Sequence, residues 1–409
     1  MPDFERWGLR GNPYTTSPID KQDLDLFVGR EDYIKVASRV IDEKSILVVE
    51  GNRGVGTTSF SNYLRFTKES RGNVLTPLRE ISVGNGWNEE LLLANVLSSV
   101  TWELEGKVPS KYKEQYNNIK AISQRVRETY RDISIQLSAV GTGVGFNKPT
   151  LVTMPSLIPT TTLVQHLLEV KNLIQVSGFQ KETIIQLNNL DVGTLFIPEQ
   201  LSSFFNKIRD ILQIAGYTWI LVGDLGLRNF IADKVDRLDD IISYDCYLEP
   251  LTLDEVELAI QARITKYSAN DHPVQPLSEE LIRILYQATN GRIRQIFGFA
   301  TRLIHSVSEN LFIEQITPEI ALPIITREVE DRLRQHHVTK RERKVLEEIV
   351  AQLGVTPSNL SRKIGLSPTN LSRILSHLLA SRCVSVIKEG RMRKYSAAPD
   401  VQIAFSKNM

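Results

Sequence analysis

The chain has 409 residues, of which 42% are hydrophobic and 24% are charged, an ordinary globular composition that excludes bulk disorder. Lys and Arg number 49 against 48 Asp and Glu, so the whole chain is not a polycation. Two cysteines, Cys246 and Cys383, exclude a disulfide framework and an all-cysteine zinc site. No apolar run approaches the roughly 18 residues that span a bilayer, and the first residues lack the apolar core of a signal peptide. These features predict a cytoplasmic protein with no membrane partner.

Alternating apolar runs and helical patterns predict an α/β fold in the first part of the chain. After a helical stretch at 31–43, the apolar run Ser45–Glu50 predicts a buried parallel strand. Further runs at Glu182–Leu187 and Thr218–Val222 predict two more strands, with helical patterns between them. Strands that alternate with helices in this way indicate a parallel sheet.

The segment Gly51–Ser59, here called the glycine loop, joins the first predicted strand to a helix, in the order that a phosphate-binding loop requires. Gly51 and Gly56 have the spacing of G-x-x-x-x-G-K-[ST], and Thr58 occupies the position whose hydroxyl would ligate magnesium if nucleotide binds. Thr57 stands where the lysine belongs, which removes a charge-assisted contact worth about 1.5–3 kcal/mol. Arg53 is a candidate substitute. The candidate cofactor-binding residues, for ATP or ADP, are Gly51, Asn52, Arg53, Gly54, Val55, Gly56, Thr57, Thr58 and Ser59.

The glycine loop has a simpler interpretation as a turn that only joins a strand to a helix. The second nucleotide motif is altered too. Hydrolysis of a γ-phosphate uses one carboxylate on magnesium and another group that activates water. After the strand Glu182–Leu187, Asn188 and Asn189 replace the two leading acids, and Asp191 lies one residue too far along to be an obvious replacement. An amide cannot accept a proton from water, so ATP turnover is predicted to be absent or very slow. The alternative is that both asparagines only cap a strand.

A segment at about residues 106–160 is predicted to be an insertion in this domain. Lys111–Asp132 has the composition of a charged helix. Apolar and polar residues alternate over Ile133–Ser138, which predicts a strand. The glycine-rich stretch 141–149 is predicted to be a loop or hairpin, and no function follows from it.

Residues 251–335 predict a small all-α domain, because four segments carry apolar residues at helical spacing. These segments are Thr252–Lys266, Ser278–Ala288, Arg292–Ser308 and Thr317–Gln335.

The charge is concentrated at the end of the chain. From Val338 onward there are thirteen Lys and Arg against five Asp and Glu, a net charge of +8, so the preceding residues carry −7. This basic segment predicts three helices, Thr339–Leu353, Thr356–Ile364 and Pro368–Ser381, and then two strands around the turn Lys388–Gly390. The order is that of a winged helix-turn-helix, and the basic charge favours a polyanion as partner.

Double-stranded DNA is the predicted partner of this segment. Its third helix presents small polar residues and one arginine, which suit a major groove, and its strands carry a basic run that suits phosphates or a minor groove. A protein-docking module is the alternative, and protein partners or self-assembly stay open. The candidate DNA-binding residues are Thr369, Asn370, Ser372, Arg373, Lys388, Arg391, Arg393 and Lys394.

The body, at about residues 8–335, resembles a P-loop ATPase of the AAA+ class, closest to the origin-recognition and STAND ATPases. The motifs are GLRGNPY, LFVGRE and the altered motifs above. The resemblance implies that Arg237, in KVDRLDD, is an arginine finger and that Arg294, in TNGRIR, is a second sensor. It also places a first sensor at Gly223 and Asp224, where a small polar residue is usual. The alternative for each arginine is a solvated surface residue or a charge at a helix end. The basic segment resembles winged helices of bacterial regulators and of origin-recognition ATPases.

The predicted architecture is α/β, with a parallel-sheet P-loop (AAA+-like) domain at 1–250, an α-helical lid at 251–337 and a winged-helix DNA-binding domain at 338–409. The favoured function is DNA binding by an AAA+-like protein with degenerate Walker motifs, in which nucleotide is a structural ligand or switch rather than fuel. Two alternatives stay open. One is an active ATP-dependent DNA-binding ATPase of the initiator or loader type. The other is a nucleotide-free scaffold or adaptor in a defence or mobile-element system.

Overall fold

The chain forms two compact units. The computed structural model describes residues 4–72, 74–140, 158–179, 182–192, 198–308, 313–352, 354–389 and 392–405. One unit, the sheet unit, is Ser17–Glu249, and the other, the helical unit, combines Met1–Thr16 with Pro250–Met409. The chain therefore passes between the two units twice, after residue 16 and after residue 249.

The sheet unit confirms the predicted α/β fold class. Its five strands are all parallel and lie in the order β2-β3-β4-β1-β5. The first, third and fourth strands lie within two residues of their predicted positions. The strands are β1 (Ile46–Gly51), β2 (Ile81–Ser82), β3 (Thr183–Asn188), β4 (Tyr217–Asp224) and β5 (Ile242–Leu248).

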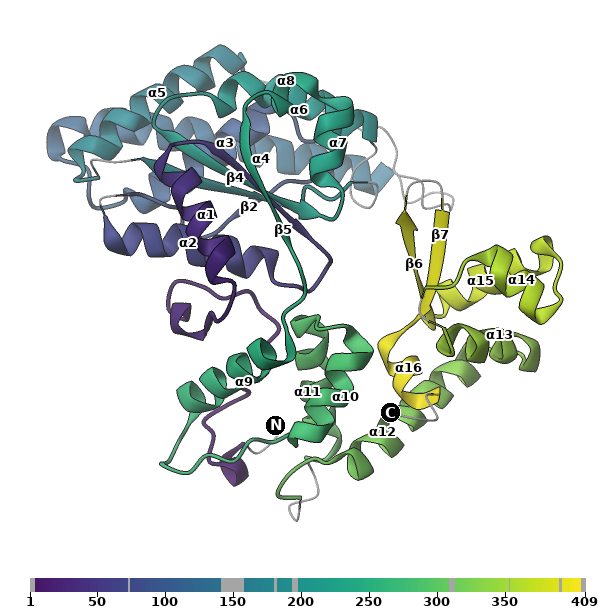
Figure 1. The fold of residues 1–409 in the computed structure, drawn as a ribbon. Coiled ribbons are helices and arrows are strands. Elements are labelled where there is room, and N and C mark those ends of the chain that lie inside the picture. Colours follow the sequence, from purple (N-terminus) through teal and green to yellow (C-terminus); the bar gives the residue numbers. More distant parts are fainter. Residues whose placement is uncertain are drawn as a thin grey trace. The chain divides into compact units, whose positions relative to one another are not determined.

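Helices cover both faces of this sheet (Figure 1). Leu47 and Val49 of β1 pack toward α1 (Glu31–Asp42) and α2 (Thr57–Arg71), and Ile46 and Val48 pack toward the opposite layer. Every residue of β1 is buried, as expected for a parallel strand with both faces covered. The opposite layer contains α3 (Glu89–Glu103), α4 (Lys113–Val140), α5 (Thr160–Val176), α6 (Pro198–Leu212), α7 (Leu227–Lys234) and α8 (Asp236–Asp239).

The predicted strand at Ile133–Ser138 is wrong, because α4 continues as a helix to Val140. The alternation there is short, and Ile133 and Leu137 are also four residues apart, a spacing that fits one face of a helix. The glycine-rich stretch 141–149 lies outside the described residues. The start of the predicted insertion belongs to the core of the sheet unit, since the Tyr116 hydroxyl donates to the Thr101 carbonyl at 3.0 Å.

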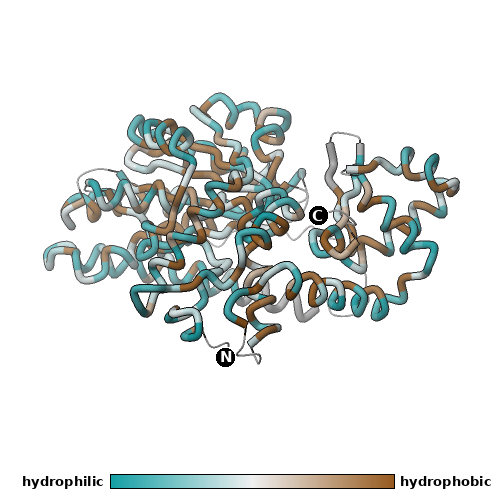
Figure 2. Tube along the Cα trace, turned by 60° about the horizontal axis from the view of Figure 1, so that its bottom comes forward, coloured by the Kyte–Doolittle hydropathy of each residue, from teal (hydrophilic) through white to brown (hydrophobic). Residues whose placement is uncertain are grey.

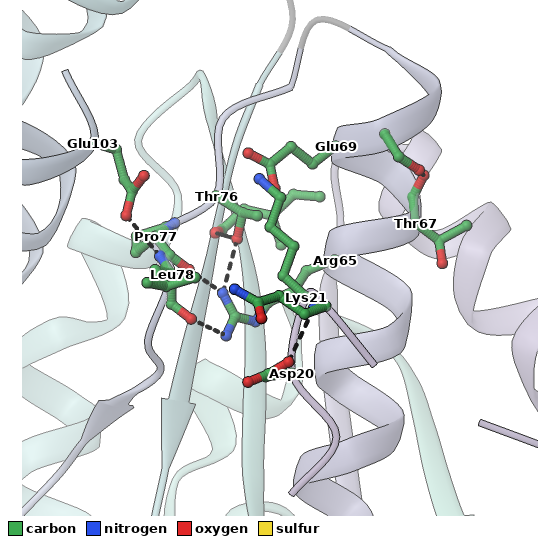
Figure 3. A network of polar contacts seen from close by, with 12 residues as sticks. Asp20, Lys21, Arg65, Thr67, Glu69, Thr76, Pro77, Leu78 and Glu103 are labelled. Carbon is green, nitrogen blue, oxygen red and sulfur yellow. Dashed lines mark hydrogen bonds and ion pairs between the residues drawn. The ribbon is translucent and has the colours of Figure 1, made fainter. Parts of the chain in front are cut away.

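A buried arginine holds α2 to the segment that follows it (Figure 3). Arg65 is 1% exposed, and its guanidinium donates to the Thr76 hydroxyl at 3.3 Å and to the carbonyls of Pro77 and Leu78. It also donates to Oδ1 of Asn62 from two of its nitrogens, at 3.2 and 3.0 Å. Burial lowers the pKa of Arg65 to about 10, so the group is still charged at neutral pH.

The helical unit contains two hydrophobic cores. Trp7, Leu9 and Tyr14 join the core of the first four helices, although the sequence placed them with the sheet domain. The Trp7 indole donates to the Glu314 carbonyl at 2.7 Å. The remaining elements form or adjoin the second core. All helices and strands of the unit after residue 250 are, in chain order, α9 (Leu253–Tyr267), α10 (Glu279–Thr289), α11 (Ile293–Ser306), α12 (Pro318–Gln335), α13 (Lys340–Val350), α14 (Pro357–Ile364), α15 (Pro368–Ala380), β6 (Val384–Glu389), β7 (Met392–Ala397) and α16 (Pro399–Phe405).

Two helices, α12 and α16, connect these cores. On α12, Ile325 packs in the first core and Leu333 in the second. On α16, Ile403 packs in the first core and Val401 in the second. Figure 2 shows hydrophilic and hydrophobic residues alternating along the helices, as expected where one face of each helix lies in a core. The lid and the C-terminal segment thus form one compact unit, and their division at residue 337 stays a prediction.

Replacing Arg65 with methionine is expected to lower the free energy of unfolding by about 3 kcal/mol, because the buried Pro77 carbonyl and Thr76 hydroxyl lose their donor. Arg71→Met is the matched control, since Arg71 is exposed at the end of the same helix; its effect should stay within about 0.5 kcal/mol. Urea denaturation followed by tryptophan fluorescence measures both values. Equal values for the two variants would show that the Arg65 network does not stabilise the unit.

Candidate functional site

The glycine loop lies at the carboxyl end of β1, where the strand order of the sheet reverses. The chain leaves β1 toward β2 on one side, whereas after β4 it crosses β1 to reach β5. Such a reversal is where open parallel sheets bind ligands. Gly51 ends β1, and a Cβ there would lie 2.8 Å from the Leu248 carbonyl oxygen. Gly54 and Gly56 have φ of +92° and +100°, and Gly56 is the N-cap of α2. The loop therefore has the backbone geometry and the helix N-terminus of a phosphate cradle.

A buried arginine outside the predicted motif fixes this loop. Arg30 is 7% exposed and is the N-cap of α1, with φ +68°. Its Nη2 donates to the Val55 carbonyl at 2.6 Å and to the Glu249 carbonyl at 3.0 Å. This role was not predicted from the sequence, although Arg30 belongs to the LFVGRE motif. Ser59 is also engaged, because its hydroxyl accepts the backbone N–H of Ile19 at 3.1 Å.

The two predicted nucleotide motifs meet at a chain of amide hydrogen bonds. Asn188, the last residue of β3, is 4% exposed, and its Nδ2 donates to Oγ1 of Thr58 at 3.3 Å. Its Oδ1 accepts from Nε2 of Gln186 at 2.9 Å. Asn189 is different: it is exposed and has φ +64°, which is typical of a turn. Of the two asparagines in the predicted second motif, only Asn188 contacts Thr58 among the described contacts.

Charged side chains gather beside the loop. Nη2 of Arg53 lies 2.9 Å from Oδ2 of Asp191. Asp191, which lies one residue too far along the sequence to be an obvious replacement for a motif acid, therefore contacts the glycine loop. Oδ1 of Asp224, the last residue of β4, accepts the Val192 N–H at 3.0 Å. Burial, and then the charge of Asp191, raise the pKa of Asp224 to about 6, although Arg53 and the Val192 N–H oppose the shift. The family resemblance placed a first sensor at Gly223 and Asp224, but the raised pKa of Asp224 was not predicted from the sequence.

A second buried carboxylate orders the turn after β4. Glu50 is 7% exposed and directly precedes Gly51. Its Oε2 accepts the backbone N–H groups of Gly226 and Arg228, at 3.1 and 2.9 Å. These groups lie at the N-terminus of α7, where a negative charge is favourable. The end of β1 thus positions the turn that follows Asp224.

The arginines implied by the family resemblance lie on different units. Arg237 is exposed on α8 of the sheet unit, and its carbonyl accepts Nε of Arg209 at 3.3 Å. Arg294 is exposed in the first turn of α11, in the helical unit. Both roles, arginine finger and second sensor, stay predictions.

The C-terminal elements follow the predicted order of three helices and an antiparallel pair of strands. The first helix ends at Val350 and not at Leu353. Ser367 is the N-cap of α15, but its side chain makes no capping hydrogen bond. The predicted turn is wrong at Lys388, which belongs to β6 and pairs with Arg393 of β7. The prediction did not specify which residues pair across the two strands, so it began the turn at Lys388, inside β6.

The predicted DNA-binding residues of α15 share one exposed face. Thr369, Asn370, Ser372 and Arg373 are all exposed, while four apolar residues of the same helix are buried: Leu371, Ile374, Leu375 and Leu378. His377, another polar residue of α15, is engaged within the unit, because its Nδ1 lies 2.8 Å from Oε1 of Glu342 on α13. This contact orients α15 on α13.

On the hairpin, Arg393 is exposed and Lys394 is partly buried. Arg391 lies outside the described residues, and the described part of Lys388 is its backbone in β6. Across the part of the chain that the structure describes, each helix is too short or too polar to cross a bilayer.

No protein-family model matches this chain, and no curated protein matches it. It is similar to the solved structure of the Aeropyrum pernix ORC1 protein in complex with DNA, with 14% identity, 98% of this chain and 96% of that chain covered, and a TM-score of 0.46. It is also similar to the Aeropyrum pernix ORC2 protein in its ADPNP–ADP complexes, with 11% identity, 97% of each chain and a TM-score of 0.49. A Walker-type ATPase of Pyrococcus abyssi has 14% identity over 96% of this chain and 99% of that chain, with a TM-score of 0.48. At these identities and TM-scores the similarities carry no conclusion about the function of this chain.

Replacing Asp224 with asparagine is expected to raise the melting temperature at pH 7.5. The raised pKa means that folding favours the protonated carboxyl, so its contribution to stability is present below the unfolded pKa and is lost as the pH rises through about 6. Asparagine keeps the acceptor for Val192 and never ionises. The difference between variant and wild type should therefore shrink as the pH falls toward 4.

Differential scanning calorimetry across this pH range measures the effect. Asp210→Asn is the control, because the Asp210 side chain is 81% exposed and should show no such pH-dependent gain. A gain at Asp224 that is the same at every pH would contradict the assignment.

Proposed function

We propose that this protein binds double-stranded DNA through α15 and the β6–β7 hairpin, and that ATP or ADP at the glycine loop is a structural ligand or switch. The observation that carries the DNA proposal is Arg373. It is exposed beside the small polar residues of α15, and within the described residues it has no ion-pair or hydrogen-bond partner. An unpaired arginine on an exposed helix is suited to the acceptor atoms of a guanine edge.

The charge of the same segment supports this proposal. Two of its acids are neutralised inside the segment or by α12, since Glu348 pairs with Lys363 and Asp400 with Arg332, and Glu342 is engaged by His377. The positive excess is therefore left on the surface. Exposed cations after residue 338 include Lys340, Arg341, Lys344, Arg362, Arg373, Arg382 and Arg393.

The proposal that nucleotide binds is based on the glycine loop. The proposal that ATP is not hydrolysed is based on Asn188. A neutral amide that is already hydrogen-bonded to Thr58 and Gln186 cannot take a proton from water. The alternative, an active ATPase, has one observation in its favour: the pKa of Asp224, at about 6, is close to that of a general base working near neutral pH. Turnover measurements separate the two. Magnesium on Thr58 and the AAA+ roles of the arginines stay predictions.

Steady-state phosphate release by the full chain is expected to equal that of a Gly56→Asp variant, whose carboxylate occupies the N-cap of α2. A coupled phosphate assay with ATP in excess makes the comparison. A wild-type rate near one per second, within the usual range of enzymes, would establish the ATPase alternative. In that case Asp224→Asn should abolish the rate.

Arg373→Ala and Arg393→Ala are expected to weaken DNA binding in different ways. Arg393 lies on the hairpin, so its loss should weaken binding to all sequences alike and reduce the slope of log affinity against log salt by about one. Arg373 should cost about 1–3 kcal/mol on the tightest site selected from a random pool, and much less on random DNA. Fluorescence anisotropy at several salt concentrations measures both.

Arg327→Ala is the matched control for these variants. The Arg327 side chain is 85% exposed in the same unit and lies 4.0 Å from Asp331 of its own helix. Its removal subtracts the same charge from another surface. If it weakens binding as much as Arg373→Ala does, α15 is not the recognition helix.

A further inference from the structure

We infer that nucleotide at the glycine loop is held without a divalent cation, and that Asn188 takes the place of the acid that would ligate one. This inference rests on the proposed nucleotide binding and goes beyond it, since it specifies how the phosphates are neutralised. It differs from the prediction that Thr58 ligates magnesium.

The donor set around Thr58 does not fit magnesium. Magnesium in nucleotide sites is held by carboxylates together with phosphate oxygens. Here the side chain that faces the Thr58 hydroxyl is an amide, and it presents its N–H and not its oxygen. The oxygen of Asn188 is occupied by Gln186, and Asp191 is paired with Arg53. In the described residues, no group of three His, Cys, Asp or Glu side chains could hold a metal.

The same hydrogen bonds suit an anion directly. Gln186 donates to Asn188, and Asn188 donates to Thr58, so the two bonds run in one direction toward the glycine loop. A hydroxyl carries one hydrogen and two lone pairs. Because one lone pair of Thr58 receives the amide N–H, its own hydrogen is available to a phosphate oxygen.

Burial strengthens this chain. Gln186 is 2% exposed and Asn188 is 4% exposed, and hydrogen bonds in such surroundings polarise one another. The remaining positive potential comes from the N–H groups at the start of α2, because the charge of Arg53 is balanced by its ion pair with Asp191. The neutral hydrogen-bond chain from Gln186 through Asn188 to Thr58, together with the start of α2, therefore acts where a lysine, an acid and a metal would act in a standard site.

Isothermal titration of the full chain with ADP and with ATP, once with magnesium chloride and once with EDTA, tests the inference. The dissociation constants in the two buffers are expected to agree within about threefold. Binding that is at least about tenfold tighter with magnesium overturns the inference and leaves the proposed nucleotide role intact. Binding in neither buffer overturns both.

Three variants identify the atoms. Thr58→Val removes the hydroxyl at nearly constant volume and should weaken binding by about tenfold in both buffers. Asn188→Asp replaces a donor with a carboxylate, so binding should weaken in EDTA and recover with magnesium. Asn118→Asp adds the same charge at an exposed position of α4, outside both motifs, and is the matched control, expected to bind like the wild type. If Asn188→Asp also binds like the wild type in both buffers, Asn188 does not take the place of the acid, and the inference is wrong.

Discussion

The close approach of β1 to β5 at Gly51 determines the geometry of everything that surrounds the glycine loop. A side chain at Gly51 would meet the Leu248 carbonyl, so the strand pairing and the loop conformation are possible together only with glycine. From this point the chain turns into α2, and the preceding residue, Glu50, reaches the start of α7. One strand end thus positions the loop, the helix N-terminus and the turn after β4.

Under the proposed function, two neutral residues of the site balance one another in charge. A standard phosphate loop balances the phosphates with a lysine and a metal ion, and balances the metal with acids. Relative to that pattern, Thr57 lacks one positive charge and Asn188 lacks one negative charge. Each change alone would leave an unbalanced charge in a site where Asn188 is buried, and such a charge is costly. With neutral residues at both positions, the proposed site needs no ion to balance either of them.

How much the sequence could predict depended on the range of the signal. The strands β1, β3 and β4, the glycine loop and the helices of the C-terminal segment carry local signals, and they lie where the sequence placed them. The role of Arg30 could not be predicted, because its hydrogen-bond partners Val55 and Glu249 are distant in the sequence. The pKa of Asp224 depends on its burial and on Asp191, and neither can be seen before the strand ends meet. The strand expected at Ile133–Ser138 failed because a six-residue alternation is too short to outweigh continuation of α4.

The two passages of the chain between the units give the proposed switch a physical route. Ile19, just after the first passage, is hydrogen-bonded at its N–H to Ser59 and at its carbonyl to Asn62, both on α2. Glu249, at the second passage, receives Nη2 of Arg30, which also holds the Val55 carbonyl of the glycine loop. A ligand that shifts this loop or the first turn of α2 therefore acts on groups that are bonded to both passages.

The helical unit can transmit such a change because its two hydrophobic cores are connected by shared helices. The helices α12 and α16 contribute side chains to both of its cores, and Arg332 of α12 is paired with Asp400 at the start of α16. The surface of α15 thus belongs to the same compact unit that receives both passages. Coupling between sites requires an element whose equilibrium both ligands bias. If nucleotide and DNA bind as proposed, the two passages and the α12–α16 connection are covalent or packed links between their sites.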